Sequence, residues 1–202
     1  MQAVLWSDYL CPWAYLGRDR TRVMRDLGVR VIPKPFELHP HLPIEGVAVR
    51  PDSRLAGVFE VIGAECAELG IPFVAPARTP NTRHVLETAE VVRLHWPDAF
   101  DALDDSLARA HWVEGLDLWD RDLVDELTTR AGAPTAEVRD MVADGVGTAA
   151  VRESMTEARA LGVTATPAWW VNDALLIPGA QPRETITRWI TRLQARAAAE
   201  SA

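Results

Sequence analysis

The strongest structural signal in the chain is the sequence QAVLWSDYLCPWAY at residues 2–15. Its apolar start, residues 2–7, predicts a short strand. Cys11 follows soon after, and Pro12 suits the first position of a helix, because proline lacks the N–H group that this position leaves unpaired. A second strand is predicted at residues 29–36, which are rich in β-branched side chains. A strand, a helix and a strand in this order begin a parallel sheet.

The end of the chain returns to strand patterns. Residues 166–171 and 174–178 predict two strands joined by a tight turn at Asn172-Asp173, two residue types that favour such turns. A last amphipathic helix is predicted after Pro182. The two ends of the chain therefore contribute strands to one split sheet.

The middle of the chain is helical. Residues 37–52 contain prolines and two histidines without a helical period, which predicts a long loop. Helical patterns then occupy residues 53–70, the segment after 80–82, and residues 97–113, 120–131, 134–144 and 148–161. So many consecutive helices cannot be crossovers of a parallel sheet. We therefore expect an α/β fold, βαβ…ββα, in which residues 1–52 and 162–202 form the sheet-containing domain and residues 53–161 a large all-helical insertion.

Composition and charge restrict the function. The 202 residues are 48% hydrophobic and 25% charged, as is typical of a globular protein, and the formal net charge of −8 argues against a nucleic-acid partner. No apolar run approaches the roughly 20 residues that span a bilayer, and Met1 leads directly into a strand without a signal-peptide pattern. We therefore expect a cytoplasmic protein with no membrane partner. Two cysteines are too few for a disulfide framework or a structural zinc site, and the histidine spacing predicts no metal site.

Cys11 is the candidate nucleophile. It lies where a strand ends and a helix begins, and the first N–H groups of a helix have no partner within it. This environment favours the thiolate, so we predict a pKa for the Cys11 thiol below the free value of about 8.5. The alternative interpretation is a small buried hydrophobic side chain.

The chain lacks the second cysteine of a dithiol centre. That cysteine would lie three residues further on, one helical turn away, where it would resolve a mixed disulfide. Ala14 occupies this position. The other cysteine, Cys66, belongs to an apolar helical stripe, which predicts a packed core residue. A reaction cycle through Cys11 must therefore end with an external thiol or with no second thiol at all.

Five motifs carry a family resemblance. They are DYLCPWAY at 8–15, PFELHP at 35–40, PNT at 80–82, GVTATP at 162–167 and GAQP at 179–182. Together, over nearly the whole chain, they resemble the FrnE-like branch of the DsbA superfamily, which is related to 2-hydroxychromene-2-carboxylate isomerases and kappa-class glutathione transferases. The resemblance implies a thioredoxin fold interrupted by a helical domain, in agreement with the split sheet.

The same resemblance implies roles for three catalytic residues. Cys11 corresponds to the family nucleophile, and Pro167 corresponds to the cis-proline that faces it, with Thr166 just before. In such proteins the backbone at this step pairs with an extended peptide or with glutathione. Thr166 and Pro167 are therefore also the expected binding residues for a thiol cosubstrate.

The sequence departs from the family at three positions. Ala14 replaces the resolving cysteine, His39 stands where FrnE-like proteins commonly have asparagine, and Leu86 stands where many have histidine. The first change argues against a dithiol oxidase. In the isomerase and transferase branches the resolving cysteine is also absent, and a single serine acts on bound glutathione.

A substrate groove is expected between the sheet domain and the helical insertion, with Trp13, His39, Asn81 and Trp169 as candidate substrate-binding residues. Neighbouring strand residues point to opposite faces, so only one of Trp169 and Trp170 is expected to border the groove. Core packing is the alternative for these indoles. His39, His41 and His111 are candidate acid–base groups because imidazole titrates near neutrality. Asn81 is expected to bond a polar group of the substrate.

Three functions remain open. The first is a DsbA-family thiol-dependent oxidoreductase in which Cys11 alone exchanges or adds to a substrate. The second is an isomerase or transferase of a small unsaturated or aromatic metabolite that uses a glutathione-like thiol. The third is a redox-inactive binding protein. We expect no tightly bound cofactor. The expected partners are a low-molecular-weight thiol such as glutathione and a small-molecule or peptide substrate, and a homodimer stays open.

Overall fold

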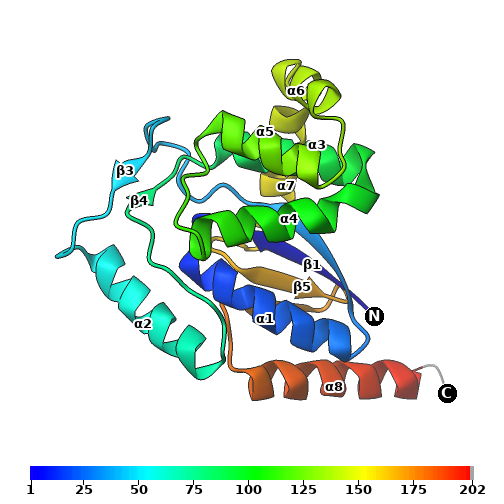
Figure 1. Cartoon of the computed structure of the whole chain (residues 1–202). Coiled ribbons are helices and arrows are strands. Elements are labelled where there is room, and N and C mark those ends of the chain that lie inside the picture. The colour runs from blue at the N-terminus through cyan, green and yellow to red at the C-terminus, as the bar shows by residue number, and fades with distance from the viewer. Residues whose placement is uncertain (201–202) are drawn as a thin grey trace.

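The computed structural model describes residues 1–200, and its elements follow the predicted order with two short strands added (Figure 1). The strands are β1 (Gln2–Ser7), β2 (Arg30–Pro35), β3 (Val47–Ala48), β4 (Arg78–Thr79), β5 (Ala168–Val171) and β6 (Leu175–Pro178). The helices are α1 (Pro12–Asp26), α2 (Arg54–Glu68), α3 (Arg83–His95), α4 (Pro97–Trp112), α5 (Arg121–Arg130), α6 (Thr135–Ala143), α7 (Val146–Ala160) and α8 (Arg183–Glu200).

Four strands form one mixed sheet in the order β2-β1-β5-β6. β1 is parallel to β2 and antiparallel to β5, and β5 pairs in turn with β6. At the β5–β6 turn, Asn172 and Asp173 have φ values of 51° and 53°, as a tight two-residue hairpin turn requires. The βαβ…ββα fold predicted from the sequence is therefore confirmed.

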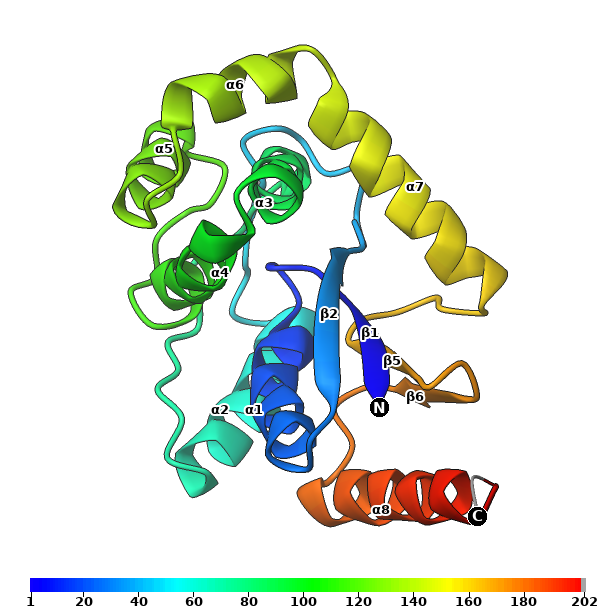
Figure 2. The same cartoon turned by 90° about the vertical axis from the view of Figure 1, so that its right-hand side faces the viewer.

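Helices cover both faces of this sheet, with α1 and α7 on opposite sides (Figure 2). Ala3 and Trp169 pack on one face with Ile190 of α8 and with side chains of α1. Trp6 packs on the other face with Met155 of α7. This arrangement follows from the alternation of side chains along β1 and β5. Because β1 lies inside the sheet, the loop that follows it reaches the boundary between the sheet and the helical region.

The helical region consists of two parts. α3 to α6 share one hydrophobic core, to which they contribute Val92, Leu103, Val124 and Val138. α2 lies apart from them beside α1 (Figure 1). Its side chains Ile62 and Cys66 pack with Leu16 of α1. Within residues 1–200, every helix is too short or too polar to span a bilayer.

β3 and β4 pair with each other as a small two-stranded sheet, with Val47 opposite Thr79. Val47 was predicted to lie in a loop, and the sequence did not indicate this pairing. Two-residue strands carry no readable period, and their partners are about thirty residues apart, so no local signal marks them. This pairing ties the loop after β2 to the segment before α3.

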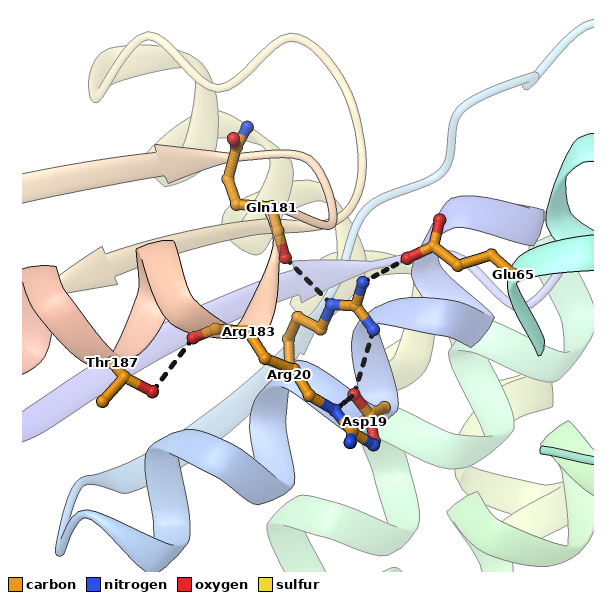
Figure 3. Close-up of polar contacts among 6 residues, drawn as sticks. All are labelled: Asp19, Arg20, Glu65, Gln181, Arg183 and Thr187. Carbon is orange, nitrogen blue, oxygen red and sulfur yellow. Dashed lines mark hydrogen bonds and ion pairs between the residues drawn. The ribbon is translucent and has the colours of Figure 1, made fainter. Parts of the chain in front are cut away.

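A polar cluster fastens α2 and α8 to α1 (Figure 3). Arg20 of α1 is buried and forms ion pairs with Asp19 and with Glu65 of α2. Its Nε donates a hydrogen bond to the Gln181 carbonyl at 2.9 Å. Asp19 also pairs with Arg183, at the start of α8. Because a buried guanidinium needs partners for its charge, this cluster fixes the three helices relative to one another.

Candidate active site

Cys11 lies at the predicted junction between β1 and α1, immediately before the helix. Its backbone N–H donates to the Asp8 carbonyl at 3.1 Å. The side chain is 5% exposed. Its thiol donates a hydrogen bond to the backbone carbonyl of Thr166, with 3.3 Å between Sγ and the oxygen. The candidate nucleophile is therefore in direct contact with the loop before β5, far from it in sequence.

The pKa of the Cys11 thiol is raised above its ordinary value, so the predicted depressed pKa is wrong. Burial is the main cause, and the nearby Asp8 carboxylate adds to it. The Thr166 side chain and the N–H groups of Ala14 and Trp13 lower the pKa by less. The prediction counted the free N–H groups at the helix start but not the loss of water around the sulfur. Burial therefore disfavours the thiolate form of Cys11.

Asp8 is a titratable residue of this site that the sequence analysis did not single out. Its side chain is 2% exposed, and its carboxylate accepts hydrogen bonds from the N–H groups of Leu38 at 2.8 Å and Leu10 at 3.4 Å. Burial raises the pKa of Asp8 to about 6, although the Leu38 hydrogen bond lowers it. The sequence feature that could have indicated Asp8 is its position, directly after the first strand and three residues before Cys11. Its ionisation near neutral pH changes the electrostatic potential at Cys11.

Thr166 and Pro167 form the loop that faces Cys11, and the peptide bond between them is cis. Thr166 is buried, and its hydroxyl has no hydrogen-bond partner in the described chain. Pro167 packs against α1 at Gly17, where a Cβ atom would lie only 2.9 Å from Pro167 Cγ. Glycine at position 17 therefore allows the loop to approach α1 closely enough for the contact between Cys11 and Thr166.

Two of the predicted substrate-binding residues have structural contacts instead. Trp169 is completely buried in the core between the sheet and α8, and its Nε1 lies 3.3 Å from the Thr21 hydroxyl. Asn81 uses both ends of its amide: Nδ2 donates to the Leu42 carbonyl at 2.8 Å, and Oδ1 accepts from the Arg83 N–H at 3.0 Å. The sequence could not show that the long loop returns to the start of α3. Trp169 is thus closed off from the groove, whereas Asn81 is held in place by the long loop and the start of α3.

Trp13 and His39 keep accessible side chains. Trp13 is 37% exposed and lies in the first turn of α1, beside Cys11. His39 is exposed in the loop after β2, next to Leu38, whose N–H contacts Asp8. Within residues 1–200, no three His, Cys, Asp or Glu side chains group as metal ligands. The structure thus brings Cys11, Thr166 and Pro167 together and leaves one indole at the surface beside them.

Both cysteines are free, and they lie in different surroundings. Ala14 occupies the position one helical turn after Cys11. Cys66 is 0% exposed and packs with Leu16 and Ile62 between α1 and α2. Burial raises the pKa of the Cys66 thiol to about 11. The prediction that Cys66 is a core residue is confirmed, so the described chain places no second reactive thiol beside Cys11.

The family model for the DSBA-like thioredoxin domain matches residues 2–190. The chain belongs to this family. The match spans both parts of the sheet and the helices between them, and it includes Cys11, Thr166 and Pro167. A search of curated proteins gave no match. The resemblance to DsbA proteins found in the sequence is therefore confirmed.

Solved structures share the fold of this DSBA-like chain. A probable DsbA oxidoreductase from Streptomyces coelicolor is 26% identical, with a TM-score of 0.84 over 96% of this chain and 90% of that one. A 2-hydroxychromene-2-carboxylate isomerase is 18% identical, with a TM-score of 0.79 over 100% of both chains. The cytosolic disulfide reductase DsbM from Pseudomonas aeruginosa, solved with GSH, is 16% identical, with a TM-score of 0.69 over 96% of this chain and 100% of that one.

Proposed function

We propose that this protein is a thiol-dependent oxidoreductase that works through one cysteine. The observation that carries the proposal is that Ala14 stands one turn after Cys11 while Cys66 is sealed in a separate core. A disulfide within the chain therefore has no route to form at Cys11 without unpacking α1 from α2. Turnover then depends on a thiol from outside the chain.

The proposed cycle has two exchanges. The Cys11 thiolate attacks one sulfur of a substrate disulfide, forms a mixed disulfide with it and releases the other sulfur as a thiolate. A low-molecular-weight thiolate then attacks the mixed disulfide, takes over the substrate sulfur and regenerates Cys11. The thiol proton passes to solvent before the first attack, and the released substrate thiolate takes up a proton from solvent. Two disulfide bonds form and two break in the cycle, so the protein itself is neither oxidised nor reduced overall.

Thr166 supports both protonation states of Cys11 in this proposal. Its carbonyl accepts the hydrogen bond of the neutral thiol. Its hydroxyl has no hydrogen-bond partner within residues 1–200, and the Thr166 side chain lowers the pKa of the thiol, which fits a hydroxyl that turns to donate to the thiolate. We place the protein in the cytoplasm, because a cycle that ends with an external small thiol suits a compartment that maintains reduced thiols.

A second function is favoured by the hydrogen bond that the Cys11 thiol donates to the Thr166 carbonyl. A neutral thiol that donates a hydrogen bond is suited to hold the sulfur of a bound glutathione-like thiolate, as an isomerase or transferase of a small unsaturated or aromatic metabolite requires. In that case the protein sulfur forms no covalent bond. Serine at position 11 would retain the donated hydrogen bond and would therefore retain activity.

Exchange assays with bis(2-hydroxyethyl) disulfide and glutathione test the proposal. Wild-type protein should turn over only when glutathione is added, Cys11→Ser should be inactive, and Ala14→Cys should acquire dithiol behaviour. Cys66→Ala is the matched control and should exchange at the wild-type rate. Loss of activity in Cys66→Ala would overturn the single-cysteine route. A wild-type rate no greater than that of a free cysteine would favour a redox-inactive binding protein.

A further inference from the structure

The helical region contains a groove that the thiol chemistry does not use. Its volume is about 670 Å³, within the usual range for small-molecule sites. It lies between the loop after β2, the start of α3, and α5 and α6, and neither Cys11 nor Pro167 lines it. Its walls include Leu42, Ile44, His84, Trp119, Arg121 and Val142.

Some of the arginines that line the groove pair with a carboxylate, and one does not. Arg83 forms an ion pair with Glu37, at 2.8 Å, and Arg139 donates to Asp125, at 2.6 Å. Arg121 also lines the groove, at the first position of α5, and no ion pair joins it to a carboxylate within residues 1–200. Glu87 lines the groove as well, and its carboxylate accepts a hydrogen bond from the Thr148 hydroxyl at 2.8 Å. The arginines of the lining, Arg83, Arg121 and Arg139, thus outnumber its carboxylates, Glu87 and Asp125.

His84 is a second polar group without a partner. It lines the groove from α3, and its Nε2 atom is buried without a hydrogen bond in the described chain. His84 and Arg121 line the same groove. Burial lowers the pKa of His84, and the positive charge of Arg121 lowers it further. Asp125 opposes this effect. An anion beside Arg121 would therefore also lie near an imidazole with unused hydrogen-bonding capacity.

The lining of the groove also includes accessible apolar side chains. Ile44 is 73% exposed and Trp119 is 41% exposed, and Leu42 and Val142 extend the same lining. Large apolar side chains that stay in contact with water mark binding surfaces when they line a concave site. The indole of Trp119 offers a flat face to an apolar ligand.

We propose that this groove binds a small organic acid with a flat apolar body. The carboxylate pairs with the Arg121 guanidinium next to His84, and the body of the ligand packs against Trp119 and Ile44. Arginine suits this contact because its planar fork holds both carboxylate oxygens. The site is separate from the thiol chemistry proposed for Cys11 and does not depend on it.

Titration calorimetry of the full chain with 3-phenylpropionate tests the proposal, with 3-phenylpropanamide as the uncharged counterpart. We expect saturable binding of the acid, with the amide and the Arg121→Gln variant each weaker by about tenfold or more, because a charge-assisted hydrogen-bond pair is lost. Trp119→Ala should also weaken binding. Arg130→Gln is the matched control, since Arg130 lies at the other end of α5 and pairs with Glu126.

Three results would overturn this assignment: no saturable binding to the wild type, equal binding of acid and amide, or wild-type affinity in Arg121→Gln. Arg121 and Trp119 are exposed, so their replacement should leave the urea unfolding midpoint unchanged. This check separates a lost contact from a lost fold. Because the assay reads binding and not thiol exchange, its failure leaves the proposed function of Cys11 untouched.

Discussion

Replacing Gly17 with alanine measures how closely the Pro167 loop packs on α1. The added Cβ would lie 2.9 Å from Pro167 Cγ and 3.1 Å from Trp169 Cη2, closer than packed carbon atoms allow. A proline ring and a buried indole cannot swing aside as a flexible surface side chain would. Overpacking of this kind costs about 1–3 kcal/mol of folding free energy.

Gly57→Ala is the matched control. Gly57 also lies inside a helix, α2, but a Cβ atom there would meet nothing within 4 Å. Both variants gain about 1 kcal/mol from the better helix propensity of alanine. The difference between them therefore isolates the crowding at Pro167. With a urea m value of about 3 kcal/mol/M, a difference of about 1–3 kcal/mol separates the two unfolding midpoints by about 0.3–1 M.

Urea unfolding followed by circular dichroism measures these midpoints, and iodoacetamide measures the consequence for the site. Alkylation of Cys11 should be faster in Gly17→Ala than in Gly57→Ala, because displacement of Pro167 weakens the hydrogen bond between the Cys11 thiol and the Thr166 carbonyl. Equal midpoints for the two variants would refute the close packing of the loop on α1, and with it the reason given for glycine at position 17.

Three other substitutions test polar contacts, and a fourth, Arg130→Leu, is the control for the first of them. Arg20→Leu should lower the free energy of unfolding by about 3 kcal/mol in urea, the lower end for a broken buried ion pair because Asp19 keeps its second arginine. Arg130→Leu removes an exposed pair and should change the same quantity by less than about 1 kcal/mol; equal losses would contradict the buried cluster. The free energy of unfolding of the wild type should fall by about 3 kcal/mol as the pH rises from about 4 to about 6, and Asp8→Asn should not show this fall. The folded chain keeps the Asp8 proton up to about pH 6, whereas the unfolded carboxyl releases it near pH 3.8, so rising pH favours unfolding. Parallel curves of stability against pH for the variant and the wild type would exclude this effect. Thr166→Val should move the pH profile of Cys11 alkylation to higher pH, because the Thr166 side chain lowers the pKa of the thiol, and an unmoved profile would show that the hydroxyl does not reach the thiolate.

The sheet and the long helices were predictable because their signals are local. Pro12 after Cys11 marks the start of α1, and Asn172-Asp173 marks the β5–β6 turn, in each case through backbone preferences of the residues themselves. Ser53 begins α2 as predicted, since its hydroxyl accepts the N–H of Ala56. The β3–β4 pairing has no such signal and was missed.

The chemistry of the site was harder to predict because it depends on contacts distant in sequence. The position of Cys11 at a helix start was readable, but its burial depends on the loop at Thr166 and Pro167, and burial decides its pKa. Strand alternation separated Trp169 from Trp170 without showing which face was the core. Asn81 appeared free to bind a ligand, although its amide is used by the Leu42 carbonyl.

The central claim is that Cys11 is the single reactive thiol of the chain. Intact-mass measurement after incubation with glutathione disulfide tests it directly, with peptide mapping to locate the product. One glutathione per chain is predicted, bound at Cys11, and it should persist until a second thiol is added. A disulfide between Cys11 and Cys66, or an adduct that leaves without an added thiol, would contradict the account.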